Sequence, residues 1–136
     1  MKEFKNVYVD ENNTWWRQIR INGTEFMIAH GDYIKGGVSG LIGEEQRLQS
    51  ILPDQGKPFN VLCLGHFHNH MEIETPRGKI LVNGSFVGGD VHSLHQLKTK
   101  SRPTQTILGV HPVHGVTWKY TLDMDYAGRM NDQAKS

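Results

Sequence analysis

The chain has 136 residues, a length that suits one domain with a modest hydrophobic core. Its hydrophobic content of 37% is typical of a globular protein, and a formal net charge of +1 implies no strong basic field, so charge neither favours nor excludes nucleic acid as a partner. Because Cys63 is the single cysteine, an internal disulfide and a structural zinc held by thiolates are both excluded.

The cysteine content and the first residues also bear on the compartment. A lone cysteine fits a reducing environment, and the opening sequence MKEFKNVYVDENN lacks the apolar segment of a signal peptide. No run of the chain approaches the roughly 20 apolar residues that span a bilayer. We therefore expect a cytoplasmic protein with no membrane partner.

The first segments of the chain predict β-structure. Residues 4–9 (FKNVYV) have the composition of an edge strand, and Trp16–Ile21 with Thr24–Ala29 predicts a hairpin. Asn22-Gly23 between the two arms suits the positive φ angles of a type I′ turn. His30 follows the second arm directly, so we expect it where a buried strand gives way to a loop.

One helix is predicted after this hairpin. Residues 33–40 (YIKGGVSG) are rich in glycine and predict a loop. Residues 41–52 then space their apolar side chains in a helical pattern, with residues 44–47 on the solvent side. Pro53 is expected to end the helix.

The most informative stretch reads VLCLGHFHNH and begins at Val61. Val61–Leu64 predicts a short buried strand that Gly65 ends. Alternation along an extended backbone would place three imidazoles on one side of the chain, those of His66, His68 and His70.

The rest of the chain predicts two more hairpins. Their arms are Met71–Thr75 with Lys79–Val82, and Gln105–Val110 with Val116–Leu122. Between them, Asn83-Gly84-Ser85 breaks the strand pattern and residues 96–104 predict an exposed basic loop. We expect one sheet-rich domain over residues 1–124 and a polar tail over residues 125–136.

The histidines at the strand ends are candidate metal ligands. His30 and the His66/His68 pair follow separate strands, and the ends of neighbouring strands lie about 5 Å apart, so their imidazoles can converge. Imidazole suits zinc, manganese, iron and nickel. The alternative is that these histidines simply meet water at polar strand ends.

A two-metal site requires carboxylates as well. Two ions about 3.5–4 Å apart can clamp a phosphoryl group and generate a hydroxide for in-line attack, but histidines cannot neutralise two dications. Asp32 is one accessory candidate, with a loop cap at Gly31 as its alternative role. The other accessory candidates are His70, Asp90 and His92, of which the last two form an Asp-x-His spacing.

Three motifs together resemble the C-terminal half of calcineurin-like metallophosphoesterases. They are His30-Gly31-Asp32, Gly65-His66-Phe67-His68 and Asn83-Gly84-Ser85-Phe86-Val87-Gly88, and the likeness covers residues 16–122. The resemblance implies an α/β fold, the β-rich half of a four-layer sandwich, and two-metal phosphatase, phosphodiesterase or nuclease chemistry. It also implies that His30 and His66 hold one divalent metal and that His68 holds the other.

The sequence departs from that family before His30. The family's first half contributes Asp-x-His, Gly-Asp-x-x-Asp and Gly-Asn-His-Asp/Glu motifs, which carry the bridging aspartate, an asparagine ligand and the general-acid histidine. None of these precedes His30, and Asp90-Val91-His92 lies downstream, where it would replace the first motif only in a circularly rearranged chain. The chain looks like half of a metallophosphoesterase: a split-gene product, a truncated form or a fragment given a new use.

Three functions remain open. In the first, a separate N-terminal half supplies the missing carboxylates and the complex hydrolyses phosphomonoesters or phosphodiesters, with nucleic acid among the candidate substrates. A sandwich without half of its strands exposes apolar edges, which favours such a partner or self-association. In the second, the chain is a non-catalytic binding or inhibitory module. In the third, it is an unrelated β-rich domain. We expect the chain alone to be inactive, with an incomplete metal site.

Several aromatic and histidine side chains have two interpretations. Trp15 and Trp16 are candidates for stacking on bases, or for a place in the core or an interface. Tyr33 and Lys35 follow His30 closely enough to reach a substrate in an assembled site. His111 and His114 flank a Pro-Val turn, where the simplest role is a surface one.

Overall fold

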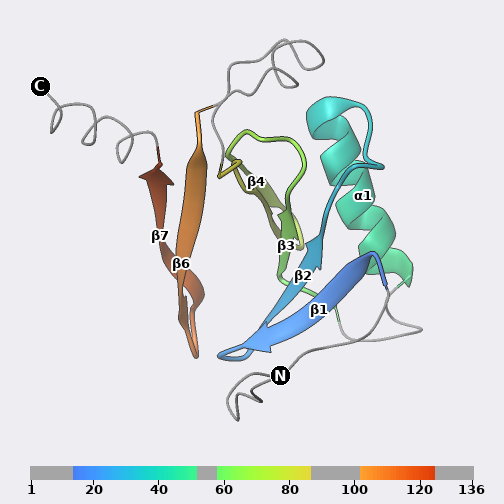
Figure 1. Cartoon of the computed structure of the whole chain (residues 1–136). Coiled ribbons are helices and arrows are strands. Elements are labelled where there is room, and N and C mark those ends of the chain that lie inside the picture. Colours follow the sequence, from blue (N-terminus) through green and yellow to red (C-terminus); the bar gives the residue numbers. More distant parts are fainter. Residues whose placement is uncertain (1–13, 52–57, 87–101, 125–136) are drawn as a thin grey trace, which may run out of the picture.

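The computed structural model describes residues 14–51, 58–86 and 102–124. Within these ranges it contains one helix and seven strands (Figure 1). They are β1 (Trp16–Ile21), β2 (Thr24–Ala29), α1 (Gly37–Ile51), β3 (Val61–Leu64), β4 (Met71–Thr75), β5 (Gly78–Val82), β6 (Thr104–His111) and β7 (Gly115–Asp123). The strand expected at residues 4–9, the tail at 125–136, and Pro53, Asp90 and His92 all lie outside the described residues.

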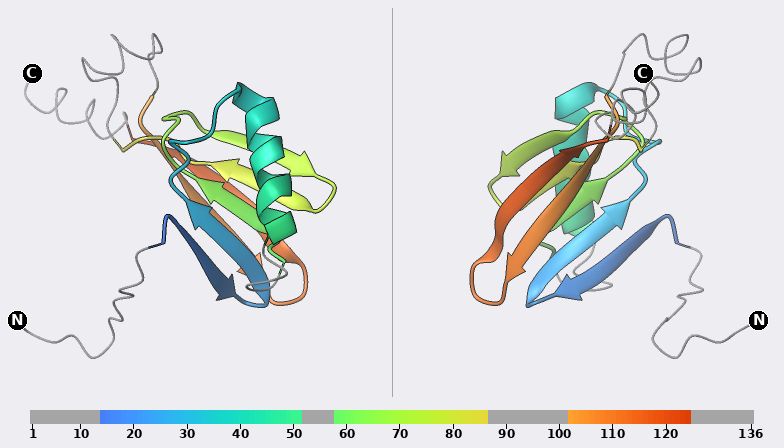
Figure 2. Two further views of the ribbon diagram at one scale, coloured as in Figure 1. Left: turned by 90° about the vertical axis from the view of Figure 1, so that its right-hand side faces the viewer. Right: turned by 60° about the vertical axis from the view of Figure 1, so that its left-hand side comes forward.

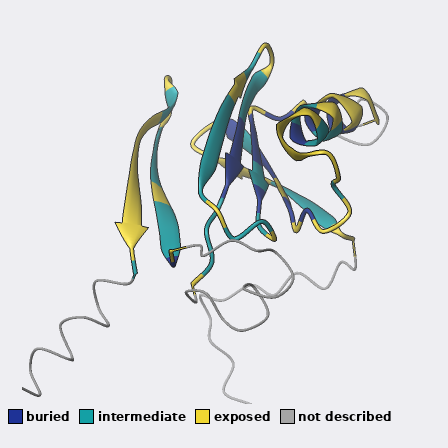
Figure 3. Ribbon diagram, turned by 90° about the horizontal axis from the view of Figure 1, so that it is seen from above, coloured by how far each residue is buried: buried dark blue, intermediate teal, exposed yellow. Residues whose placement is uncertain are grey.

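The described residues form three layers. Five strands make a mixed sheet in the order β1-β2-β3-β5-β4, with β2, β3 and β5 parallel and the two outer strands antiparallel. Parallel strands have to be covered on both faces. Helix α1 covers one face and the β6–β7 hairpin lies against the other (Figures 2 and 3). The predicted α/β fold with one main helix is confirmed.

Alternation along the central strands builds a core on each face of the sheet. Toward α1, the buried side chains are Met27, Ala29, Leu41, Leu48, Phe59, Leu62, Leu64, Ile80 and Val82. Toward the hairpin, Phe26, Val61 and Leu81 are buried against Leu108, Val110 and Val116. Because β3 is buried on both sides, its short run of four apolar residues is explained.

The three hairpins predicted from turn residues are confirmed. Asn22 (φ 45°) and Gly23 (φ 79°) both have the positive φ that a type I′ turn requires, and β1 pairs with β2 over their full length. β4 and β5 are joined at Pro76-Arg77, and β6 pairs with β7 in antiparallel fashion with one bulge between Gly109 and Val110.

The helix begins earlier than predicted. It starts at Gly37, so the expectation of a loop through residue 40 was wrong for its second half. Gly36 turns the chain with a φ of 93°, and the Ser39 hydroxyl donates to the Gly36 carbonyl at 2.8 Å. A Cβ on Gly40 would collide with the Lys35 carbonyl. The glycines therefore make a tight entry to the helix rather than a longer loop. No helix within the described ranges has the length and apolar character needed to cross a membrane.

One side chain on the predicted solvent face of the helix is buried. Glu45 is only 2% exposed, whereas Ile51 is exposed. The Gln49 amide donates to the Glu45 carboxylate at 3.2 Å and to the Phe59 carbonyl at 2.7 Å. Leu41, Glu45 and Leu48 share one stripe by their spacing, so the placement of Glu45 outside was wrong. The hydrogen bond from Gln49 offsets part of the cost of burying this carboxylate.

Candidate metal centre

The structure brings His30 and His66 together at the carboxyl ends of two neighbouring parallel strands. β2 ends at Ala29 and β3 ends at Leu64, and these two residues are partners in the sheet register. The two imidazole rings have centroids 5.1 Å apart and an interplanar angle of 71°. Both side chains are exposed. The predicted convergence of the two strand ends is therefore found for this pair.

Backbone contacts fix the two loops that carry these rings. The Gly65 N–H donates to the His30 carbonyl at 3.1 Å. Gly31 has a φ of 97°, and a Cβ there would come within 3.2 Å of the Phe67 ring. Phe67 also packs on the core beside α1. The positions of His30 and His66 thus depend on the fold rather than on flexible loops.

Residues 65–70, which we call the histidine loop, form a turn and not a strand. His66 and His68 have φ angles of 61° and 56°, and the Phe67 N–H donates to the Gly65 carbonyl at 2.7 Å. Because the backbone is not extended, the expectation that alternation places His66, His68 and His70 on one side was wrong. Left-handed conformations are uncommon for non-glycine residues and concentrate at functional sites.

His70 contacts the second sheet instead of the His30–His66 pair. Its Nδ1 lies 3.1 Å from the Thr106 hydroxyl and its Nε2 lies 3.5 Å from the Thr121 hydroxyl. Burial, and secondarily the positive charge of Lys119, lowers the pKa of His70 below its usual value. In this position the neutral ring attaches the histidine loop to the β6–β7 hairpin.

The other candidate ligands are not gathered around the pair. Asp32 is exposed in the turn that follows Gly31, and His68 is half-buried in the histidine loop. Across the described ranges, no three His, Cys, Asp or Glu side chains form a group that could hold a metal. Within these ranges, two imidazoles therefore meet without a third potential ligand beside them.

The separation of the two rings fits metal binding. An imidazole nitrogen lies about 2.0–2.1 Å from zinc, which puts the ring centroid roughly 3.2 Å from the ion, and a tetrahedral angle of about 109° then separates two centroids by roughly 5.2 Å. The observed 5.1 Å agrees with this value. It also falls in the range of an edge-to-face ring pair, about 4.5–7 Å. Imidazole nitrogen is a ligand that first-row divalent ions accept, and no anionic ligand of the described residues joins the pair.

Asn83 joins the site to the second sheet, a role that the sequence did not suggest beyond a break after β5. Its backbone N–H donates to the Leu64 carbonyl at 2.8 Å, and its side chain accepts from the Thr106 N–H at 3.1 Å.

Beside His30, a hollow of ≈ 430 Å³ is lined mainly by apolar atoms, including those of Ile28 and Cys63. Burial raises the pKa of Cys63 to about 11, so its sulfur is a thiol and not a thiolate ligand at neutral pH.

The aromatic residues next to the site are held by protein contacts. Trp15 meets Tyr33 edge-on with ring centroids 4.8 Å apart, and the Arg47 guanidinium lies 5.7 Å from the Trp15 centroid. Arg47 in turn donates twice to Glu44, at 2.8 and 2.6 Å. This cluster fastens the start of β1 and the loop after His30 to α1. Trp16 packs partly buried on the core.

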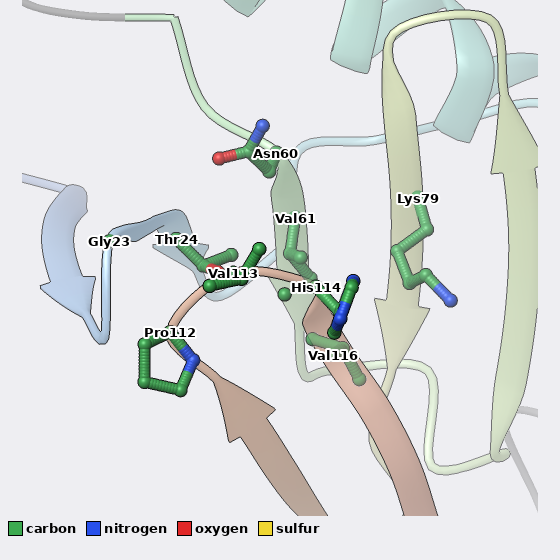
Figure 4. Close-up of a pocket in the computed structure, with 10 residues that line it drawn as sticks. Gly23, Thr24, Asn60, Val61, Lys79, Pro112, Val113, His114 and Val116 are labelled. Carbon is green, nitrogen blue, oxygen red and sulfur yellow. The ribbon is translucent and has the colours of Figure 1, made fainter.

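A second hollow, of ≈ 380 Å³, lies at the other end of β3 (Figure 4). It is lined by the turns at Gly23 and at residues 112–116, with His114 stacked on His111 at 4.8 Å. Lys79 also lines the hollow, but its ammonium is ion-paired with Glu72 and Glu74 of β4 at 3.0 Å each. The hollow has no convergent set of chemical groups comparable with the His30–His66 pair.

The mixed sheet, with α1 on one face and the β6–β7 hairpin on the other, is a fold that known structures share. Solved structures of Vps29 share this fold. The chain is similar to Vps29 of Entamoeba histolytica, solved as a complex with zinc, with a TM-score of 0.56 and 17% identity over 80% of this chain and 60% of that one. It is also similar to Vps29 of Cryptosporidium parvum, with a TM-score of 0.56 and 13% identity over 80% and 57% of the two chains.

The comparisons are limited to the fold. No protein-family model matches the sequence, and no curated protein matches it. The chain spans about three fifths of the length of the Vps29 structures that it matches. At 13–17% identity the likeness shows the architecture alone.

Proposed function

We propose that this chain is the C-terminal half of a divalent-metal-dependent phosphoesterase that a complementary N-terminal half completes. The observation that carries the proposal is the approach of the His30 and His66 imidazoles, 5.1 Å apart, at the carboxyl ends of two parallel strands. Crevices at the carboxyl ends of strands are the usual place for ligands in open α/β sheets. The motif resemblance assigns these two histidines to one metal and His68 to the second.

The chain's own residues would hold and orient the metal. Zinc, manganese, iron or nickel would accept the two exposed imidazoles, and such an ion supplies Lewis-acid polarisation of a phosphoryl oxygen. The backbone bond from Gly65 to His30 and the packing of Phe67 on Gly31 keep the two rings in place. Among the described residues no carboxylate joins the pair, so in this proposal a second polypeptide contributes the carboxylates that balance two dications.

Calorimetric titration of the purified chain with manganese or zinc chloride tests the metal part. We expect weak binding that falls at least tenfold in His30→Ala and in His66→Asn, where asparagine tolerates the left-handed backbone. His114→Ala, at the exposed turn, is the matched control and should bind as the unmodified chain does. Tight binding of two ions to the isolated monomer would contradict the proposal of an incomplete site.

Hydrolysis of p-nitrophenyl phosphate and bis(p-nitrophenyl) phosphate tests the catalytic part. The isolated chain should release no nitrophenol above the buffer rate with either the monoester or the diester. Activity of the chain alone that disappears in the His66→Asn variant would show that no partner is required.

A non-catalytic binding or inhibitory module is the second candidate. The lack of any three-donor group in the described ranges favours it, because a resident metal usually has at least three protein ligands. Under this function, metal titration shows no specific heat and the substitutions at His30 and His66 leave partner binding unchanged.

A further inference from the structure

We propose that the outer edge of β6, with the apolar side chains on both sides of it, receives an α/β segment that adds a strand to β6 and covers the outer face of the β6–β7 hairpin. This inference rests on the proposed function, because such a segment is the complementary half described above. It goes further by assigning the surface where that half docks and the direction of its strand.

The hairpin covers only part of the five-stranded sheet. β7 lies over β4, where Lys119 is ion-paired with Glu72. On the other side of the hairpin, the Asn22 amide donates to the Val110 carbonyl at 2.8 Å, so the outer edge of β6 faces the β1–β2 hairpin. Figure 2 shows β1 and β2 extending beyond β6.

Three isoleucines on this uncovered flank are exposed. Their exposed fractions lie between 37% and 42%, and we call them the isoleucine stripe: Ile19, Ile21 and Ile28. They share a face of the sheet with buried Phe26, because Ile19 is its partner across the β1–β2 ladder and strand residues two apart point the same way. The stripe therefore continues the core between the two sheets into solvent.

The edge of β6 is open at its centre. The Met124 N–H donates to the Pro103 carbonyl, so by the alternation of an antiparallel ladder Thr106 and Leu108 direct their backbone groups away from β7. Asn83 accepts from the Thr106 N–H, and Asn22 binds the Val110 carbonyl further along. Between these two contacts, the N–H and carbonyl of Leu108 have no partner among the described residues.

The opposite side of the hairpin is apolar and exposed as well. Its outer apolar face consists of four side chains that are 43–66% exposed: Ile107, Trp118, Tyr120 and Leu122. The Trp118 and Tyr120 rings meet at 5.4 Å, and Trp118 lies directly on Gly109. Soluble monomers rarely expose contiguous apolar patches of more than a few hundred Å².

A partner that reaches around the β6 edge would cover both surfaces, which no described residue covers. A strand added to β6 would lie over the isoleucine stripe, and a helix following it would cover the outer apolar face. A second copy of this chain does not fit, because pairing two β6 edges across a two-fold axis would force both β1–β2 hairpins into the same layer. The matched Vps29 structures contain enough additional residues for such a segment, since more than a third of their length has no counterpart in this chain.

The same geometry sets the direction of the added strand. The Thr104 N–H donates to the Ser85 carbonyl, so β6 begins near the carboxyl ends of β2 and β3, where the histidines lie. From there β6 runs in the direction opposite to β2 and β3. A strand antiparallel to β6 would run with β2 and β3 and end next to His30. Its last residues would then reach the His30–His66 pair, which no carboxylate of the described residues joins.

Co-expression with the polypeptide encoded by the reading frame directly upstream of this chain in its genome tests the proposal. We expect a 1:1 complex by light scattering. Ile28→Asp, in the isoleucine stripe, and Tyr120→Asp, on the outer apolar face, should each weaken it at least tenfold. Val38→Asp, a 48% exposed position on α1, is the matched control and should leave the complex unchanged. Melting curves of each variant alone verify that it is folded.

Hydrogen exchange gives a second readout at the edge itself. The Leu108 amide should exchange at least tenfold more slowly in the complex than in the free chain. His66→Asn should retain the complex, so loss of metal chemistry alone would leave this inference standing. The inference is overturned if no complex forms with the probe, if Ile28→Asp and Tyr120→Asp bind as tightly as the unmodified chain, or if these substitutions instead break a homodimer.

Discussion

Phe67 packs over Gly31 so closely that a single methyl group at position 31 would come within 3.2 Å of its ring. This contact joins the loop after β2 to the loop after β3, and each loop carries one imidazole of the candidate metal pair. Gly31 also has a φ of 97°, a conformation that glycine adopts without strain. The spacing of His30 and His66 therefore depends on a glycine that ligates nothing.

Gly31→Ala should destabilise the fold and separate the two histidine loops. The left-handed backbone and the contact with Phe67 together predict a loss of about 1–3 kcal/mol in the free energy of unfolding, measured by urea titration. Gly43→Ala is the control, since a Cβ on this helical glycine meets nothing within 4 Å. It should stabilise the protein by about 1 kcal/mol, and equal effects at the two positions would refute the argument.

His68→Gly should make the metal-free protein more stable. His68 has a φ of 56°, and relief of this left-handed conformation is worth about 1 kcal/mol. The measurement is the urea midpoint in the presence of a chelator, with His114→Gly, whose backbone is not left-handed, as the comparison. If His68 is a ligand, metal affinity should fall as stability rises. An unchanged or lower midpoint would mean that the backbone at this position stores no strain.

Gln49→Ala should be costly because it removes a buried hydrogen-bond donor. The Gln49 amide satisfies both the buried Glu45 carboxylate and the Phe59 carbonyl. Removing it leaves two buried acceptors without their donor, which predicts a loss of about 1–3 kcal/mol by chemical unfolding. Gln46→Ala, three residues earlier on the exposed face, should change stability by less than about 0.5 kcal/mol.

Cys63 should react slowly with iodoacetamide until the protein unfolds. Burial raises its pKa to about 11, against about 8.5 for a free cysteine, so the thiolate fraction at pH 8 is lowered roughly a hundredfold. The folded protein should show a rate that rises up to tenfold per pH unit from pH 7 to 9, whereas the rate in urea should level off near pH 9. Fast labelling of the folded chain at pH 7 would contradict a buried thiol.

The same pKa shift predicts how stability depends on pH. Because the folded state keeps the Cys63 proton more tightly than the unfolded state, its contribution to stability is fully present below pH 8.5. It declines as the pH rises from about 8.5 toward 11. Cys63→Ala should lose this alkaline decline when urea midpoints are compared at pH 7 and pH 10.

Local signals predicted most of the fold. Asn22-Gly23 fixed the first hairpin, because few other residue pairs accept two positive φ angles, and the apolar run from Val61 to Leu64 identified the central strand. The start of α1 was missed because glycines predict loops on average, while here Gly36 and Gly40 allow a close turn into the helix. Such a close approach depends on tertiary contacts that composition does not report.

The candidate site was only partly predictable for a related reason. His30 and His66 could be placed at strand ends, and parallel neighbours put those ends side by side. The direction of each ring within the loop depends on backbone angles that a sequence pattern does not determine, as the φ of 61° at His66 illustrates. The role of His70 was hidden because its partners, Thr106 and Thr121, are far from it in sequence.

Asn22 and Asn83, at the outer edge of β6, affect how readily the isolated chain can aggregate. Amyloid-like stacking requires a continuous segment of about six residues with free backbone groups. Asn22 and Asn83 occupy the rim at either end and leave the groups around Leu108 between them. The unbound chain should therefore resist fibril formation through this edge, although several of its isoleucines are exposed.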